Sequence, residues 1–215
     1  MNLTQQFLKA TENGDLKSVK KLIKKGANVH AKDELALHCA AYYGHLEIVK
    51  YLIEEHGADI QVCGDEEDCE DVFNSAVMGK HIEIVKYLVK KHKDAIRKFV
   101  VNAIVNAVEI EEFNIVKYLI TEGGADVSEY GEDVLYAAAK MGRIDIVKCL
   151  VGEHGVNIYT TDNDRDPIEV AIKNDHVEVV KYLASKSSIE DQFEICYYAG
   201  KHGYREIINQ ILATV

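Results

Sequence analysis

Nine histidines and five cysteines are the side chains in this chain of 215 residues that are best suited to bind a metal or to act as nucleophiles. Most of the histidines recur at fixed positions around a repeated Val-Lys pair. Three lie four residues before its valine: His45, His81 and His176. Three others lie seven residues after it: His56, His92 and His154. Packed helices lie about 8–10 Å apart, whereas zinc needs its ligands at about 2.0–2.3 Å. One histidine per repeat therefore cannot converge on one ion, and we expect no metal and no cofactor.

The cysteines favour neither a zinc site nor a reactive thiol. Cys149 and Cys196 occupy positions where equivalent segments carry Tyr and Leu, which predicts packing roles. Cys63 and Cys69 flank an acidic run, and such a pair without partner histidines or cysteines is a poor zinc motif. Neighbouring acids also raise the pKa of a thiol. The chain has no phosphate-binding loop, dinucleotide-binding, nucleophile-elbow or H-E-x-x-H motif, so we expect no enzyme.

The Val-Lys pair belongs to a longer unit that recurs through the whole chain. Its marker is Val-Lys-Tyr-Leu or a near equivalent, and the copies begin at residues 19, 49, 85, 116, 147, 180 and 208, which are 28 to 36 residues apart. The second copy continues with apolar residues spaced i, i+1, i+4, i+5, which share one helix face: Ile48, Val49, Leu52 and Ile53. Each unit therefore contains two short helices, of which the second is clearly amphipathic.

The best-formed unit is 34–64, which contains Leu37-His38, Ala40-Ala41, Gly44-His45 and the tip Gly57-Ala58-Asp59. This pattern and its period resemble the ankyrin repeat. Tetratricopeptide repeats end on a proline, and the whole chain has one proline. The Val-Lys-Tyr-Leu motif resembles the sequences found in the expanded ankyrin-repeat families of giant DNA viruses. The resemblance implies an all-α ankyrin-repeat solenoid of about seven helix-turn-helix repeats with short β-turn tips.

We assign the whole chain, residues 1–215, to a single ankyrin-repeat domain. Its repeats are placed at about 1–33, 34–64, 65–94, 95–127, 128–158, 159–190 and 191–215. Helix N-caps are expected where the ankyrin consensus has Thr: Asp71, Asn102, Asp133 and Asp166. In the third repeat the segment 92–95, His-Lys-Asp-Ala, replaces the Gly-Ala-Asp tip, so we expect a shortened or missing β-turn there.

The formal net charge of −11 argues against a nucleic-acid partner and favours a basic protein surface. The N-terminal segment has no long apolar run, which argues against a signal peptide or a membrane partner. An odd number of scattered cysteines predicts reduced thiols. These features predict a cytoplasmic or nuclear location, in a host cell if the protein is viral.

The resemblance implies two zones of partner contact, which are the β-turn tips and the two variable residues after the Ala-Ala of each first helix. The second zone supplies Tyr42, Tyr43, Met78, Lys140, Met141, Lys173 and Asn174. The tips supply Asp65, Glu66, Tyr130, Tyr159 and Asp162, and also Lys32, Asp33 and Glu34. Exposed aromatic residues are frequent binding hot spots, which favours Tyr42 and Tyr43. Alternatively, one tyrosine of this pair packs on the adjacent repeat, and most tip residues form a solvated rim.

We therefore expect a non-enzymatic protein–protein interaction module that binds a protein partner through its concave face and tips. It would act as a monomer, by occluding a surface or by bridging two partners. The acidic run 65–71 is either a solvated loop or an anionic recognition element. The alternative function is a structural, self-assembling protein, because the segment 207–212 leaves an apolar edge at the seventh repeat.

Overall fold

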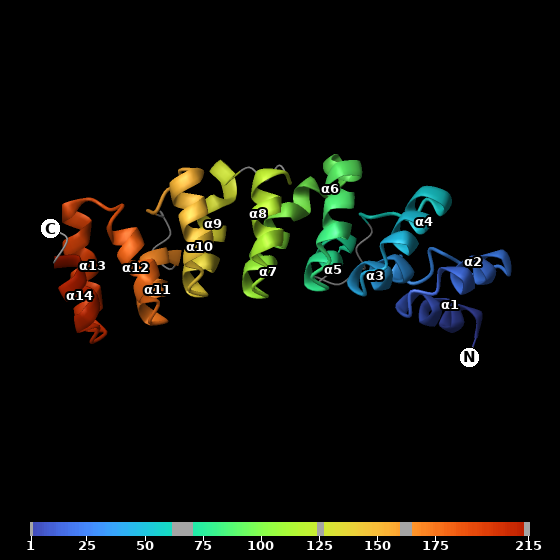
Figure 1. Ribbon diagram of the computed structural model, residues 1–215, viewed down its shortest axis with the longest axis horizontal. Coiled ribbons are helices and arrows are strands. Elements are labelled where there is room, and N and C mark those ends of the chain that lie inside the picture. The colour runs from blue at the N-terminus through green and yellow to red at the C-terminus, as the bar shows by residue number, and fades with distance from the viewer. Residues whose placement is uncertain (1, 62–70, 124–126, 160–164, 213–215) are drawn as a thin grey trace. The chain divides into compact units, whose positions relative to one another are not determined.

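The computed structural model describes residues 2–61, 71–123, 127–159 and 165–212 (Figure 1). At residues 128–130 and 210 it describes the backbone alone. Three of the predicted tip residues, Asp65, Glu66 and Asp162, lie outside the described residues, as do Cys63 and Cys69. The contacts divide the chain into two compact units, Met1–Gly124 and Ala125–Val215.

Unit 1 is built from helix pairs. Its helices are α1 (Leu3–Glu12), α2 (Leu16–Lys24), α3 (Leu35–Tyr42), α4 (Leu46–His56), α5 (Val72–Met78), α6 (Ile82–Ile96), the 3-10 helix η1 (Arg97–Phe99), α7 (Val100–Glu109) and α8 (Phe113–Thr121). The first helices of the pairs lie side by side in the order α1, α3, α5, α7, and the second helices in the order α2, α4, α6, α8. The unit therefore has one layer of first helices and one layer of second helices.

Unit 2 repeats this arrangement. Its helices are α9 (Val127–Lys140), α10 (Ile144–Lys148), the π-helical turn η2 (Cys149–Glu153), α11 (Pro167–Lys173), α12 (Val177–Ala184), α13 (Ile189–Lys201) and α14 (Arg205–Leu212). The first helices α9, α11 and α13 lie side by side, as do the second helices α10, α12 and α14. The described residues form no β-strand, which confirms the expected all-α class.

Two recurring positions build the core of both units. Six of the first helices, all except α1, share a fully buried alanine, which lets neighbouring helices approach closely: Ala40, Ala76, Ala107, Ala138, Ala171 and Ala199. Most second helices share a fully buried leucine four positions after the isoleucine or valine that precedes the Val-Lys pair: Leu52, Leu88, Leu119, Leu150 and Leu183. Burial of each large aliphatic side chain contributes about 1.5–3 kcal/mol. The buried alanine of the first helix and the buried leucine that follows the Val-Lys pair therefore stabilise most of the repeats.

Two of the four predicted N-caps are confirmed. Asp71 Oδ1 accepts a hydrogen bond from Asn74 N at 2.8 Å, although burial raises the pKa of this carboxyl group above its usual value. Asp166 Oδ1 accepts from the backbone amides of the first turn of α11, at 2.7 and 2.9 Å, and Pro167 occupies the first helical position. At these two positions the chain thus keeps the N-cap hydrogen bond but uses Asp where the ankyrin consensus has Thr.

The predictions for Asn102 and Asp133 are wrong. Helix α7 begins at Val100, directly after η1, and α9 begins at Val127, so both residues lie inside helices. The carboxylate of Asp133 forms an ion pair with Arg165 instead. A helix that starts early moves the cap away from the position that a fixed repeat length predicts.

The missing β-turn in the third repeat is confirmed. Gly57 ends α4 in the left-handed conformation, with φ 66°, but the equivalent segment of the third repeat has no glycine. A side chain in that conformation costs about 1–2 kcal/mol. Helix α6 instead continues to Ile96 through a non-helical His92, with φ −133°, and leads into η1 and α7.

The kink places the His92 ring in a partly buried site. The ring lies edge-on to Tyr87, with 5.8 Å between ring centroids, and the buried Nε2 has no hydrogen-bond partner among the described residues. Burial lowers the pKa of His92, and Lys91 adds to this effect while Glu54 opposes it. The folded state therefore favours the neutral ring.

We expect the free energy of unfolding of unit 1 to decrease as the pH falls below about 6.5, the ordinary histidine pKa. Below that value the unfolded chain binds a proton that folded His92 resists, so acid favours unfolding. The substitution His92→Gln removes this titration and should make the pH dependence less steep. Urea unfolding followed by circular dichroism between about pH 5 and 7.5 measures it. Equal pH slopes in the two proteins would rule out His92 as the source.

Candidate partner-binding surface

Histidines at the start of three second helices bind the preceding repeat. Their Nε2 atoms donate to backbone carbonyls: His45 to Glu12 at 2.8 Å, His81 to Tyr42 at 2.9 Å, and His176 to Lys140 at 2.9 Å. A carbonyl oxygen only accepts, so Nε2 carries the proton in each ring. These bonds explain why the three histidines recur in register, and they fix the ends of the first helices α1, α3 and α9.

A glycine two residues after each bonded carbonyl makes room for the ring. Gly14, Gly44 and Gly142 all have positive φ, between 68° and 83°. A Cβ atom added at Gly44 would lie 2.4 Å from the His81 ring, and one at Gly142 would lie 2.5 Å from the His176 ring. The glycine of one repeat and the histidine of the next therefore form one unit of inter-repeat packing.

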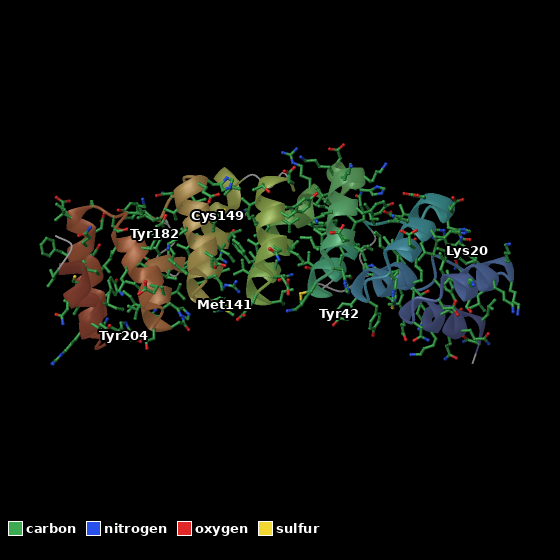
Figure 2. The ribbon with its side chains drawn as sticks, viewed as in Figure 1. Lys20, Tyr42, Met141, Cys149, Tyr182 and Tyr204 are labelled. Carbon is green, nitrogen blue, oxygen red and sulfur yellow. The ribbon has the colours of Figure 1, made fainter. Side chains whose placement is uncertain are left out.

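Tyr42 and Tyr43 lie at the end of α3, where His81 donates to the Tyr42 carbonyl (Tyr42 is labelled in Figure 2). The two tyrosines are 46% and 51% exposed. The two rings meet edge to face, with centroids 5.3 Å apart. Met78, at the equivalent position of α5, is partly buried. The structure thus presents an exposed aromatic pair at the position that the sequence favoured.

The equivalent residues of unit 2 differ in their exposure and in their hydrogen-bond and ion-pair partners. Lys140 and Met141, at the end of α9, are exposed (Figure 2). Lys173 is exposed and forms an ion pair with Glu169 at 2.9 Å. Asn174 Nδ2 donates to Val170 O at 2.8 Å and so helps to end α11. Asn174 has a structural role beside any binding role.

Several predicted tip residues occupy other environments. Position 130 lies inside α9 and not in a turn. Glu34 is 4% exposed, and its Oε1 accepts a hydrogen bond from Asp59 N at 3.3 Å and lies 2.5 Å from His30 Nδ1. Glu34 therefore joins two successive tips and is not part of a solvated rim. Tyr159 is exposed, but its hydroxyl donates to Asp191 Oδ2 at 2.6 Å.

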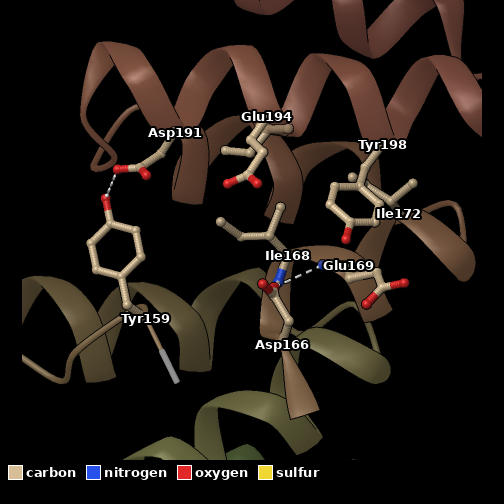
Figure 3. A pocket seen from close by; sticks show the side chains of 9 residues that line it. Tyr159, Asp166, Ile168, Glu169, Ile172, Asp191, Glu194 and Tyr198 are labelled. Atoms are coloured by element: carbon tan, nitrogen blue, oxygen red, sulfur yellow. Dashed lines mark hydrogen bonds between the residues drawn. The ribbon is translucent and has the colours of Figure 1, made fainter. Parts of the chain in front are cut away.

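A pocket between α11 and α13 was not predicted from the sequence. It has a volume of about 80 Å³, and its lining is mostly apolar with carboxylates around it (Figure 3). The lining residues are Tyr159, Asp166, Ile168, Glu169, Ile172, Asp191, Glu194, Ile195 and Tyr198. A signal was present in the sequence, because carboxylates three residues apart occur on both first helices, at 166 and 169 and at 191 and 194.

The four carboxylates of the pocket have different partners. Asp166 caps α11, and Glu169 is paired with Lys173. Hydrogen bonds from Ser188 and Tyr159 lower the pKa of Asp191, so this group is ionised near neutral pH. Glu194 has no hydrogen-bond or ion-pair partner among the described residues, and Figure 3 shows its carboxylate directed toward Ile168.

Two overlapping stretches, residues 7–99 and 73–162, match the family model of ankyrin repeats (3 copies). The chain belongs to the ankyrin-repeat family. This ankyrin-repeat chain is similar in structure to the human ASB11 ankyrin repeat domain, with a TM-score of 0.65 and 22% sequence identity over 85% of this chain and 83% of that chain. At this identity the similarity shows the fold alone. No curated protein sequence matches the chain.

The match confirms the fold class, which is an all-helical ankyrin-repeat solenoid. Ankyrin-repeat domains in general mediate protein–protein interactions, and the fold is a non-enzymatic interaction scaffold. Among the helices described for this ankyrin-repeat chain, none is long and apolar enough to cross a membrane.

Among the described residues of the ankyrin-repeat chain, one cluster combines side chains of types that bind metals. The ligand atoms of Cys149, Glu153 and His154 lie within 4.8 Å of one another, because the π-helical turn η2 brings His154 over Cys149. Ligands at about 2.0–2.3 Å from a tetrahedral zinc lie roughly 3.3–3.8 Å apart. Cys149 Sγ and Glu153 Oε2, which are 3.7 Å apart, lie within this range. The cluster lies within one repeat, so it does not follow from the positions of equivalent histidines in successive repeats.

Burial decides the chemistry of two other thiols. It raises the pKa of Cys39, with a smaller contribution from Glu12, and it raises the pKa of Cys196. A thiol with a raised pKa is a poor nucleophile at neutral pH. Neither Cys39 nor Cys196 is therefore suited to act as a nucleophile.

Proposed function

We propose that this ankyrin-repeat chain is a protein–protein interaction module that binds its partner through the layer of first helices and the tips, without chemistry. The observation that carries the proposal is the exposed pair Tyr42 and Tyr43. Its backbone is held by the bond from His81 to the Tyr42 carbonyl. Rigid tyrosines bring a large contact area at a low cost in conformational entropy, and such residues dominate many interfaces.

The partner in this proposal is a protein with a basic surface, since the chain carries a net charge of −11. Other contacts of the proposal are Met78 in unit 1 and Lys140, Met141, Lys173 and Asn174 in unit 2. The module would occlude a surface or bridge two partners in the cytoplasm or nucleus. If the similarity to giant-virus families reflects the source, the compartment is that of an infected cell.

Affinity capture from cell lysate tests the proposal, with the double variant Tyr42→Ala/Tyr43→Ala beside the wild type. We expect the variant to bind the captured protein at least about 30-fold more weakly, since loss of hot-spot residues costs about 2 kcal/mol or more. The affinity is then measured with the purified partner by calorimetry. Far-UV circular dichroism should be unchanged, because both side chains are exposed.

A matched control is available in unit 2. Tyr197 and Tyr198 form a second edge-to-face pair, with centroids 6.1 Å apart. The variant Tyr197→Ala, which leaves the pocket residue Tyr198 in place, should retain the partner if the first pair is the contact. Retention by the Tyr42/Tyr43 variant with full affinity would show that the proposed surface is wrong.

Self-assembly is the second candidate function, and exposed apolar residues on the seventh repeat favour it. Phe193 is 63% exposed and Tyr197 71%, and Ile189 and Leu212 are also exposed. In the second repeat, by contrast, Ala41 is fully buried, whereas its equivalent Gly200 is exposed. Apolar patches of this kind mark interaction sites. Self-assembly would be supported if the mass measured by light scattering rises with protein concentration and Phe193→Glu returns it to the mass of a monomer. A monomeric mass at every concentration would exclude self-assembly.

A further inference from the structure

The pocket between α11 and α13 has the features of a receptor for one basic side chain. We infer that it accepts the side chain of a lysine or an arginine on the surface of the partner. The inference rests on the proposed function, because it names the chemistry by which the partner would be recognised. It is carried by the size of the pocket, its apolar floor and the carboxylates at its rim (Figure 3).

The size of the pocket selects a single side chain. Small-molecule sites have volumes of about 300–1,000 Å³, whereas this pocket holds about 80 Å³. The end of one long side chain is therefore the largest group that it can enclose. The isoleucines Ile168, Ile172 and Ile195 supply an apolar floor. Lysine and arginine have aliphatic stems that pack on apolar surface while their charge stays at a polar rim.

The charge of the rim selects a cation. Nearby positive groups are already engaged: Lys173 pairs with Glu169, and Arg165 is directed at Asp133 and at the ring of Tyr136. Asp191 is ionised and held by Ser188 and Tyr159. The carboxylate of Glu194 is left without a partner among the described residues. Glu194 is exposed, so a basic guest would add an attraction at the rim, whereas an anionic guest would be repelled and a neutral guest would gain nothing from the charge.

Glu194 and Tyr198 would make the contacts with the guest. Both side chains come from α13 and line the pocket beside Ile168 and Ile172 (Figure 3). A carboxylate binds an ammonium or guanidinium group directly, and a tyrosine ring attracts a cation over its face. A bound metal ion fits less well. Among the described residues, no three carboxylates of this pocket come within 4.8 Å of one another.

Nuclear magnetic resonance of the full-length, 15N-labelled chain tests the inference without the partner. The probes are the N-acetyl methylamides of lysine and of arginine, with the norleucine derivative as an uncharged control of similar shape. We expect saturable shifts at the amides of Ile168, Ile172 and Ile195 with the basic probes. The norleucine probe should bind about 5-fold more weakly, the size of one solvent-exposed charge interaction. Higher salt should weaken the basic probes alone.

Glu194→Gln is the diagnostic variant, because it keeps the shape of the side chain and removes the charge that has no partner. It should reduce the affinity for the basic probes about 5-fold and leave the norleucine probe unchanged. Glu190→Gln, on the same helix but outside the pocket, is the matched control and should bind as the wild type does. Equal shifts with all three probes, or none with any, would overturn the inference.

The proposed function and the inference about the pocket can be refuted independently of each other. Binding of the probes does not involve Tyr42 or Tyr43, so a negative titration leaves the capture experiment intact. Conversely, a partner that binds the Tyr42→Ala/Tyr43→Ala variant with full affinity but loses affinity for Glu194→Gln would move the contact surface to unit 2.

Discussion

Gly44→Ala is expected to lower the free energy of unfolding of unit 1 by about 3 kcal/mol. Gly44 has a φ of 83°, a conformation that costs an alanine about 1–2 kcal/mol. Its new Cβ would also lie 2.4 Å from the ring of His81, the donor to the Tyr42 carbonyl. Forcing a methyl group into a packed site costs about 1–3 kcal/mol more. Urea unfolding followed by circular dichroism measures the loss.

Gly57→Ala is the matched control in the same repeat. Gly57 also has positive φ, 66°, but a Cβ there meets nothing within 4 Å. Its substitution should cost only the conformational term of about 1–2 kcal/mol. The double variant Gly44→Ala/His81→Ala removes the clash, so its cost should be less than the sum of the two single costs by roughly 1 kcal/mol or more. Strict additivity would show that the ring and the glycine do not interact.

Leu52→Ala is expected to cost unit 1 about 3–5 kcal/mol. Leu52 is fully buried in α4, which packs against α2, α3 and α6. Truncation of such a side chain loses its burial energy and leaves a cavity, and buried Leu→Ala changes cost about 2.7–5 kcal/mol. Stability in a repeat protein is a sum over neighbouring repeats, so the loss should appear in the unfolding transition of unit 1.

Ile53→Ala is the control for Leu52→Ala, because Ile53 is the next residue of the same helix and is partly exposed. It should cost less than half as much, since solvent already reaches the side chain and a smaller cavity is left. Similar losses at the two positions would contradict the packing of α4 described above. The comparison also tests helical periodicity, since the sequence placed both residues on one apolar face.

The repeat was predictable from the sequence because it depends on local periodicity, and its resemblance to the ankyrin repeat implied the fold class and the position of the aromatic pair. The spacing of Ile48, Val49 and Leu52 determines which face of a helix is buried. The fixed distance from the repeated Val-Lys pair also showed that His45, His81 and His176 occupy equivalent positions. The sequence placed Tyr42 and Tyr43 at the end of a first helix for the same reason. All of these conclusions follow from positions within one repeat.

The tertiary structure decided what depends on contacts between repeats and on departures from the average repeat. Helix α9 begins early, at Val127, which makes Asp133 a helical residue paired with Arg165. Glu34 is buried because Asp59 of the next tip donates to it. The carboxylates of the pocket are brought together by the stacking of α11 and α13. Periodicity determines which way a side chain points along its own helix. Which neighbour it meets depends on where each helix starts and on how closely the repeats stack, and these are properties of the packed chain.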